Sequence, residues 1–476
     1  MADPPESGAA RRPNFLFIMS DDHAAHAISA YGSVINSTPN LDRIAVNGVR
    51  FDAAFCTNSI CAPSRASILT GTYNHVNGVT TLDTPLDNSL WTFPRALRDA
   101  GYTTGLIGKW HLGHGAGADP VGFDHWRVLP GQGHYHNPVM LEAGGHVVER
   151  SGYVTDLITD DSIEFIDSCG DAPFALLCHH KAPHRTWEPS ARHFSMYDDV
   201  DVPEPATFRD DLSGRAEVVQ AARMRMMDLD PIIDLRSPVP EGLTLDQEIS
   251  WRYQRYIKNY LRVVASIDDN VGRLLDHLEA TGLAENTVVI YTSDQGFFLG
   301  DHGWFDKRLM YEESLVMPLL VQGPGIDAPG STCSEIVTNV DFAATMLELA
   351  GVEAPGHLQG RSLAPLLRGE HPDDWPQSMY YRYWMHRDGA HLCPAHYGVR
   401  TRRHKLICYY NDPLGQPGAH GPADPVEWEL FDLEADPLEI DNRADDPAYA
   451  TVRAELEAEL ARLQAEVGDE PYAGGT

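Results

Sequence analysis

Asn14-Phe-Leu-Phe-Ile-Met-Ser20 contains five consecutive apolar residues, and Asp21 and Asp22 follow it directly. A continuous apolar run is typical of a strand that is buried on both faces of a parallel sheet. Ligands of open α/β sheets bind at the carboxyl ends of strands, so the Asp pair is expected at a functional edge. Two adjacent carboxylates repel each other and favour a cation between them. Two solvated loop aspartates that cap a helix are the simpler alternative.

Three more buried strands are predicted, and polar residues follow each of them. They are residues 102–108 before Lys109 and His111, residues 173–179 before Lys181 and His184, and residues 287–292 before Asp294 and Gln295. Amphipathic helices are predicted at residues 38–49, 91–100, 153–168 and 253–281. This alternation predicts an α/β fold with a large, mainly parallel sheet flanked by helices.

The pattern changes near residue 372, where short strands are predicted at residues 378–385, 397–401 and 405–410, before a helix at residues 448–467. We therefore predict a disordered N-terminus (residues 1–12), a catalytic domain (residues 13–371) and a smaller C-terminal α+β domain with a short antiparallel sheet (residues 372–476). The acidic, proline-containing stretch of residues 198–240 is interpreted as an insertion that walls the site.

The composition excludes several classes of partner. The chain has 476 residues, and 36 Lys and Arg against 69 Asp and Glu give a net charge of −33. Such an acidic chain is not expected to bind nucleic acid or an anionic membrane surface. Neither a signal peptide nor a membrane-spanning run is visible, which favours a cytoplasmic protein unless a signal has been removed. Seven cysteines scattered over the chain do not form a disulfide framework.

Cys61-Ala-Pro-Ser-Arg65, followed by Leu69-Thr70-Gly71, is the most informative short motif. Pro63 can begin but not continue a helix, so Cys61 and Arg65 are expected at a loop-to-helix junction. A nucleophile beside a cation at a helix start suits an anion. A buried packing cysteine is the simpler interpretation of this stretch alone.

Together, the strand-end residues, Cys61, Arg65 and the later Lys307 form a hard-cation site of oxygen ligands surrounded by Lys, Arg and His. This combination predicts an anionic substrate with several oxygens, either a phosphate or a sulfate.

The chain resembles the type I sulfatases of the alkaline phosphatase superfamily over nearly its whole length. The motifs that carry the resemblance are Met19-Ser-Asp-Asp-His23, the Cys61 motif with its tail, Gly108-Lys-Trp-His-Leu-Gly113, Pro183-His184, Thr292-Ser-Asp-Gln-Gly296, and Gly300-Asp-His-Gly303 leading to Lys307. The resemblance implies an alkaline-phosphatase-like fold. It also implies that a formylglycine-generating enzyme oxidises Cys61 to Cα-formylglycine, whose hydrate is the nucleophile.

The family pattern also implies roles for the other residues. Asp21, Asp22, Asp294 and Gln295, with the residue made from Cys61, would hold Ca²⁺, with Mg²⁺ or Mn²⁺ as alternatives. Gln295 departs from the Asn or His frequent at this position, which bears on the identity of the metal. Arg65 and Lys109 would stabilise the nucleophile, His111 would be the base, and Lys307 and His184 would act on the sulfate and near the leaving group. A geminal diol, unlike a serine, can expel sulfate by re-forming its aldehyde.

The segment from Asp294 to Arg308 is similar to bacterial carbohydrate sulfatases, including N-acetylglucosamine-6-sulfatases. The leading hypothesis is a carbohydrate 6-O-sulfatase acting on a small or oligosaccharide sulfate ester, with His302 and Arg308 as substrate contacts. The alternatives are a broad-specificity arylsulfatase, a phosphonate or phosphodiester hydrolase, and a metal-binding relative without activity. The sequence leaves the oligomeric state open.

Overall fold

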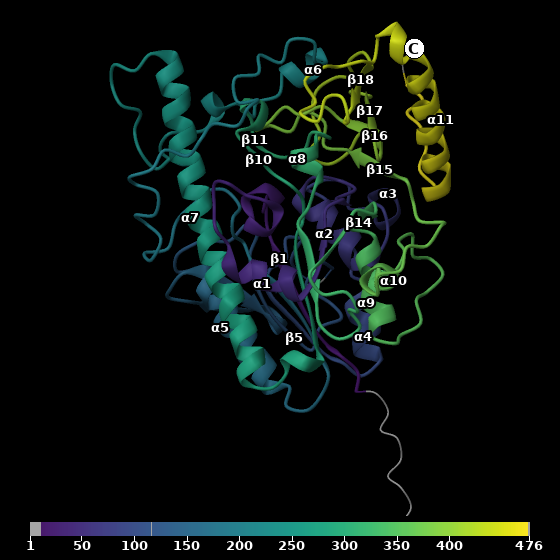
Figure 1. The fold of residues 1–476 in the computed structure, drawn as a ribbon. Coiled ribbons are helices and arrows are strands. Elements are labelled where there is room, and N and C mark those ends of the chain that lie inside the picture. Colours follow the sequence, from purple (N-terminus) through teal and green to yellow (C-terminus); the bar gives the residue numbers. More distant parts are fainter. Residues whose placement is uncertain (1–10, 116, 475–476) are drawn as a thin grey trace, which may run out of the picture.

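The computed structural model describes residues 11–115 and 117–474. Most of the predicted disordered N-terminus (residues 1–12) therefore lies outside the described residues. A ten-stranded sheet with the order β13-β2-β12-β9-β1-β8-β4-β5-β6-β7 forms the centre of the molecule (Figure 1). β1 (Asn14–Ser20) lies inside this sheet, where it pairs in parallel with β8 (Phe174–His179) and with β9 (Thr287–Ser293).

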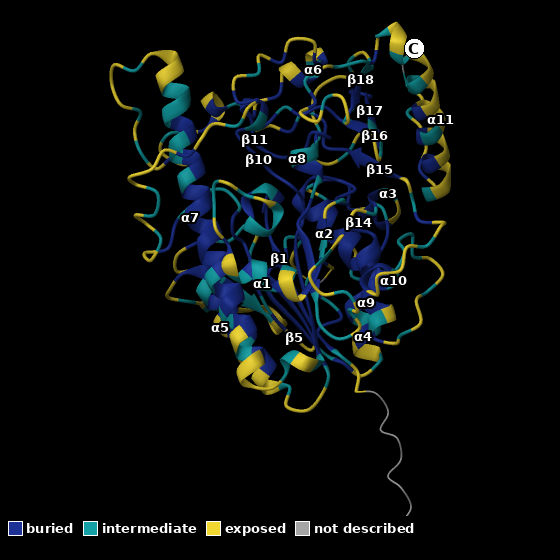
Figure 2. Ribbon diagram, viewed as in Figure 1, coloured by how far each residue is buried: buried dark blue, intermediate teal, exposed yellow. Residues whose placement is uncertain are grey.

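β1 is buried along its whole length, because helices cover both faces of the sheet. Phe15, Phe17 and Met19 pack into one core, whereas Leu16 and Ile18 pack into the other, as the two-residue period of a strand requires. The first core lies under α2 (Cys61–Thr70), α4 (Phe93–Asp99) and α9 (Asp341–Leu349), and the second under α1 (Pro39–Asn47), α5 (Val154–Ser168) and α7 (Leu245–Ala280). In Figure 2 the helix faces turned toward the sheet are buried, and the exposed residues lie on the outside.

The sheet is mixed, because antiparallel strands flank its parallel centre. β4 (Thr103–Lys109) extends the parallel part beside β8, whereas β12 (Leu319–Gln322) runs antiparallel to β9. The short elements of this part are β2 (Gly48–Phe51), β3 (Ala54–Phe55), α3 (Asn74–Asn77), β5 (His125–Leu129), β6 (Val139–Glu142), β7 (His146–Glu149), α6 (Glu217–Gln220), β10 (Phe298–Leu299), β11 (Phe305–Asp306), α8 (Glu312–Leu315), β13 (Ser331–Cys333), β14 (Val337–Thr338) and α10 (Ala364–Leu367).

A second, four-stranded antiparallel sheet lies near the C-terminus. Its strands are β15 (Ser378–Tyr383), β16 (His396–Thr401), β17 (His404–Tyr409) and β18 (Glu427–Asp432), and α11 (Ala450–Val467) covers it. The predicted fold class, a mainly parallel sheet with a smaller antiparallel one, is confirmed. The domain boundary near residue 372 stays a prediction.

Helix α7 differs from its prediction at one end. It begins at Leu245 rather than near residue 253, and Thr244 and Gln247 form a capping box there. The first turn, Leu245 to Gln247, is exposed, and the fully buried apolar positions lie from Tyr253 onward, so the periodicity shows only the buried part of the helix. None of the helices in the described chain is long and apolar enough to cross a membrane.

Gly108 provides a test of how β4 is aligned with β8. Its φ is +107°, and a Cβ at this position would collide with the backbone carbonyl of His179. We expect Gly108→Ala to destabilise the protein by about 2 kcal/mol or more, because both the backbone conformation and the contact forbid a side chain. Thermal unfolding measures the effect.

Gly356→Ala is the matched control, since a Cβ added at this position would meet no heavy atom within 4 Å and its φ is not positive. Equal melting temperatures for the two variants would contradict the proposed alignment.

Candidate active site

The carboxyl ends of β9, β1, β8 and β4, which are neighbours in the sheet, bring the predicted strand-end residues together. Asp21 and Asp22 follow β1, Asp294 follows β9, and Lys109 ends β4. Carboxylate oxygens of Asp21, Asp22 and Asp294 lie within 4.8 Å of one another. All three side chains are fully buried. The residues that the sequence predicted at the strand ends therefore lie together at one edge of the sheet.

Three buried carboxylates at this distance repel one another. Burial raises the pKa of Asp22 to about 6, and the charge of Asp294 adds to this effect, whereas Lys307 opposes it. The backbone N–H of Asp22 donates to Asp294 Oδ1 at 3.2 Å, with Asp22 in the left-handed region at φ +71°. This conformation places the two carboxylates against each other, so a positive charge is needed among them.

Two buried oxygens at this edge accept no hydrogen bond among the described residues: Asp21 Oδ1 and Gln295 Oε1. The Nε2 of Gln295 donates to Asp22, which leaves Oε1 free to bind another group. Oxygen ligands from carboxylates and an amide are the set that a hard divalent cation prefers. The residues therefore fit a divalent metal ion.

Each carboxylate is also paired with a basic side chain. Lys307 Nζ donates to both oxygens of Asp22, at 2.6 and 2.7 Å, Lys109 bonds Asp21, and Arg65 Nε donates to Asp294 Oδ2 at 2.9 Å. Burial lowers the pKa of Lys109 well below its usual value. Burial acts the same way on Lys307, but Asp22 together with the other acidic groups around it, Asp306 among them, outweighs burial, and the pKa of Lys307 is raised.

Cys61 is the first residue of α2, and its side chain is buried against the carboxylates. Its Sγ and ligand atoms of Asp21 and His184 all lie within 4.8 Å of one another. Burial raises the pKa of the Cys61 thiol to about 12. An unconverted Cys61 would therefore be protonated and a weak nucleophile near neutral pH.

The two predicted catalytic histidines flank this cluster. His184 Nδ1 donates to the carbonyl of Arg185 at 2.6 Å, so its Nε2 faces Asp22 Oδ2, 3.8 Å away. His111 has a φ of +57° and a buried Nδ1 without a hydrogen-bond partner in the described chain. Burial, and then the charge of Lys109, lower the pKa of both histidines well below its usual value. Both rings are therefore neutral at neutral pH.

The structure does not bring His302 to this cluster. Its Nδ1 bonds Asp210 Oδ2 at 3.0 Å, its backbone N–H donates to Thr207 Oγ1 at 2.8 Å, and its ring packs against Trp304 and Tyr311. These contacts favour a structural role for this histidine, and its predicted contact with substrate stays a prediction.

Arg308 lies next to Lys307 and joins a second polar cluster. It pairs with Asp306, and its Nε lies 3.5 Å from Asp388 Oδ2, while His391 Nδ1 is 2.9 Å from Asp388 Oδ1. Sequence reasoning missed Asp306, Asp388 and His391. The latter two lie in the loop between β15 and β16, and a loop has no periodicity that would mark them.

Lys181, for which the sequence suggested no role, also faces the site. Its ammonium lies 4.5 Å from the centre of the Tyr135 ring and donates to the carbonyl of Arg185 at 3.3 Å. Burial lowers its pKa to about 8, although Asp22 and Glu188 act against this. Gln132, a neighbour of Lys109 and His111, was missed as well.

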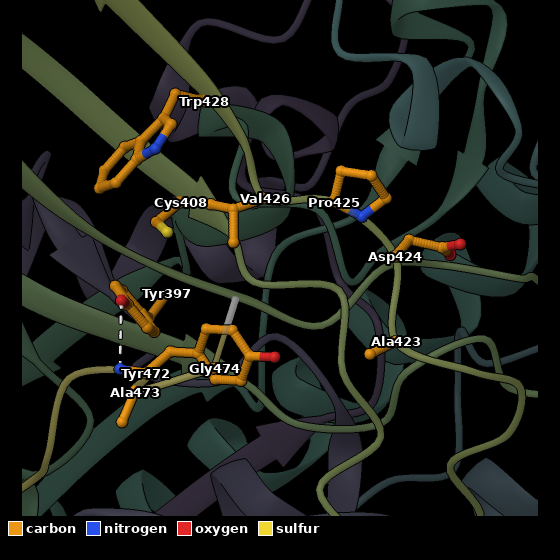
Figure 3. Close-up of a pocket in the computed structure, with 10 residues that line it drawn as sticks. All are labelled: Tyr397, Cys408, Ala423, Asp424, Pro425, Val426, Trp428, Tyr472, Ala473 and Gly474. Atoms are coloured by element: carbon orange, nitrogen blue, oxygen red, sulfur yellow. Dashed lines mark hydrogen bonds between the residues drawn. The ribbon is translucent and has the colours of Figure 1, made fainter. Parts of the chain in front are cut away.

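A cavity of about 920 Å³ lies in the C-terminal sheet rather than at this edge (Figure 3). Tyr397, Trp428 and Tyr472 line it, together with Asp424. Its lining contains neither the carboxylates nor the basic residues described above, so the chemistry assigns the active site to the strand ends.

Two family models match the chain. The model described as "Sulfatase" matches residues 13–352, and the model described as "N-sulphoglucosamine sulphohydrolase, C-terminal" matches residues 300–466. The first spans both halves of the strand-end cluster, from Asp21 to Lys307.

Several characterised proteins are similar over most of the chain. The N-acetylglucosamine-6-O-sulfatase of Bacteroides thetaiotaomicron is 41% identical and covers 98% of this chain and 88% of its own. The human N-acetylglucosamine-6-sulfatase is 30% identical over 78% of this chain and 67% of its own. The solved structure of BT4656 in complex with its substrate D-glucosamine-2-N,6-O-disulfate has a TM-score of 0.90 and 40% identity, and the match covers 96% of this chain and 98% of that one.

Addition of a divalent cation is expected to stabilise the protein. After treatment with a chelator, Ca²⁺ at 100 times its dissociation constant should contribute about 2.7 kcal/mol, because it binds only the folded site. A thermal melt with and without Ca²⁺ measures this. Asp21→Asn and Asp294→Asn should lose most of the rise in melting temperature.

Asp373→Asn, at an exposed position, is the control and should keep the rise. A Ca²⁺-dependent rise of the same size in Asp294→Asn would show that the ion binds elsewhere.

Proposed function

The chain belongs to the sulfatase family, and on that premise we propose that it hydrolyses the 6-O-sulfate ester of a glucosamine residue. As a member of this family it is a sulfuric ester hydrolase that acts on carbohydrate sulfates. The observation that carries the choice of ester is the 41% identity, over nearly the full length, to a relative named N-acetylglucosamine-6-O-sulfatase.

Sulfatases generally use a formylglycine and a divalent metal. In this chain Cys61 is the precursor, converted by a formylglycine-generating enzyme, and Asp21, Asp22, Asp294 and Gln295 hold Ca²⁺. A formylglycine hydrate at position 61 would supply the attacking hydroxyl, and a cation held by these four residues would lower the pKa of that hydroxyl and neutralise charge on the sulfate oxygens. The raised pKa of the thiol is consistent with this role, because unconverted Cys61 would be a weak nucleophile near neutral pH.

The basic side chains orient the nucleophile and bind the sulfate. Arg65 is held by Asp294 and by the carbonyl of Lys109 at 2.9 Å, and its Nη2 has no partner in the described chain. Arg65 lies four residues after Cys61 on α2, which puts the two residues on the same face of the helix, so this N–H group is assigned to the residue at position 61. Lys109 and Lys307 stabilise the negative charge that develops on the hydroxyl and on the sulfate oxygens.

The two histidines move the protons. His111 is neutral at neutral pH, so it can accept a proton from the hydrate, as a general base must. His184 presents Nε2 to the site. In the neutral ring the proton is on Nδ1, so Nε2 first takes up a proton, which an anionic sulfate bound beside it favours, and then donates this proton to the leaving alcohol. Lys307 is less suited to this step, because its pKa is raised and Asp22 holds it with two hydrogen bonds.

The cluster around Arg308 is assigned to the sugar. Arg308 Nε and Asp388 Oδ2 face each other at 3.5 Å, and His391 Nε2 lies 3.4 Å from Asp306 Oδ2. These buried groups form ion pairs but no hydrogen bonds among the described residues, so their hydrogen-bonding capacity is left for a ligand. Sugar hydroxyls can both donate and accept hydrogen bonds, so they match this mixture of groups.

A panel of substrates tests the function. We expect kcat/KM for N-acetylglucosamine-6-sulfate to exceed the value for 4-nitrophenyl sulfate and for bis(4-nitrophenyl) phosphate. Arg308→Gln should lower the sugar rate by about tenfold or more and change the aryl rates little, because hydrogen bonds from a charged group to the sugar are lost. Released sulfate and nitrophenol are measured.

Cys61→Ser is the control and should abolish turnover of the sugar sulfate. A sugar rate no higher than the phosphodiester rate would instead support a phosphonate or phosphodiester hydrolase. Higher turnover of the aryl sulfate would support a broad-specificity arylsulfatase. No turnover of any ester by the converted protein would identify a metal-binding relative without activity.

The role of His184 is tested by the acidity of the leaving group. A sugar alcohol needs a proton to leave, whereas 4-nitrophenolate does not. His184→Gln should therefore lower kcat for the sugar sulfate by about 10²- to 10⁴-fold, the usual contribution of a general acid, and lower kcat for 4-nitrophenyl sulfate far less. Equal losses on both substrates would assign His184 to sulfate binding.

A further inference from the structure

A groove that the active-site chemistry does not use lies beside the His184 segment. It consists of two hollows of about 600 and 490 Å³, which share Glu188, Pro189, Phe194 and Arg236 in their linings. Thr186 and Arg255 line the first hollow. Each volume is within the roughly 300–1,000 Å³ that is usual for ligand sites. We call this feature the arginine groove.

The arginine groove adjoins the active site through Arg185. The carbonyl of Arg185 accepts hydrogen bonds from His184 Nδ1 and Lys181 Nζ, both at the active-site edge. Its guanidinium bonds both oxygens of Asp234 at 2.6 Å and lies 5.4 Å from the centre of the Phe305 ring, two residues before Lys307. Thr186, the next residue, already lines the groove. His184 of the active site and Thr186 of the groove are therefore separated along the chain by Arg185 alone.

The groove also contains a cation without a balancing acid. Arg255 has no carboxylate within ion-pair distance in the described part of the chain, and its Nε and Nη2 donate only to the carbonyl of Leu235, at 3.3 and 3.2 Å. Arg262, which also lines the groove, is paired with Asp198, and Arg236 with Glu188. In a chain with a net charge of −33, an uncompensated arginine in a hollow is suited to an anion.

Apolar side chains lie exposed beside these cations. Phe194, Ile232 and Ile233 are 67%, 65% and 60% exposed and line the first hollow. An aromatic ring and branched aliphatic side chains can pack on the C–H face of a sugar ring. A guanidinium beside apolar surface therefore suits a sugar that carries an acidic group.

We propose that the arginine groove binds the sugar that adjoins the hydrolysed glucosamine in an oligosaccharide, and that Arg255 recognises a sulfate or carboxylate on it. The enzyme then prefers the sulfated end of an anionic chain over the free monosaccharide. This inference rests on the proposed function for the ester that is cleaved. Residues 198–240, which the sequence predicted to wall the site, supply Ile232, Ile233 and Arg236 to the groove.

A heparin-derived tetrasaccharide with a 6-O-sulfated glucosamine at its non-reducing end is the probe, and N-acetylglucosamine-6-sulfate is the reference. We expect a higher kcat/KM for the tetrasaccharide. Arg255→Met should lower this value by about tenfold, mainly through KM, because a charged hydrogen bond to the second sugar is lost. It should leave the rate on the monosaccharide unchanged.

Arg273→Met is the matched control, because Arg273 is also on α7 but bonds Asp160 and Asn270 instead of lining the groove. It should leave both rates unchanged. Equal losses on both substrates in Arg255→Met, or no loss on either, would overturn the inference.

Calorimetric binding to the Cys61→Ser protein separates the inference from the proposed function. If the tetrasaccharide binds and Arg255→Met weakens this binding, the groove is supported. A failure of the converted enzyme to hydrolyse either sugar would refute only the proposed ester and would leave the groove supported. Absence of tetrasaccharide binding, or binding that Arg255→Met leaves unchanged, overturns the groove whatever the hydrolysis rates.

Discussion

The repulsion among three buried carboxylates is the constraint on which the active site depends. The strand order β9-β1-β8-β4 brings Asp21, Asp22 and Asp294 together where water cannot screen them. Lys109, Lys307 and Arg65 each pair with one of these carboxylates, and the remaining free oxygens suit a divalent cation. In this acidic chain, three basic residues thus lie at the edge of the sheet that carries the buried carboxylates and that would bind an anionic substrate.

The position of the nucleophile is coupled to these carboxylates through α2. Ser64 donates to the backbone carbonyl of Asp294, and Asn339 Nδ2 donates to Ser64 Oγ at 2.8 Å. Arg65, on the same helix, bonds the side chain of Asp294. The first turn of α2, which carries Cys61, is therefore held by the residue that also serves the metal site. A change at Asp294 would disturb both functions.

Catalysis and substrate recognition come from different parts of the fold. The strand ends supply the charged groups for the sulfate, and their backbone is fixed by the sheet. The proposed sugar contacts lie outside the sheet: Asp388 and His391 are in the loop after β15, and residues 186–238 and α7 line the arginine groove. Loops on a rigid scaffold can vary without loss of stability, so one sulfatase core can serve different sugars.

The sequence by itself predicted the buried strands β1, β8 and β9, which are mostly apolar, and β4, whose apolar content is lower. It also predicted the polar residues that follow these strands, because the order of residues along the chain can be read without any tertiary contact. The motifs also indicated the sulfatase family, which the comparisons confirm.

The sequence did not predict β18, since charged residues, such as the buried Glu429, interrupt its apolar pattern. His302 was predicted near the substrate because it is close to Lys307 in sequence, but its ring bonds Asp210 and does not join the strand-end cluster. Only the tertiary structure decided that Arg308 meets Asp388 and that Arg255 has no acidic partner in the described chain, because contacts between distant segments leave no local period in the sequence.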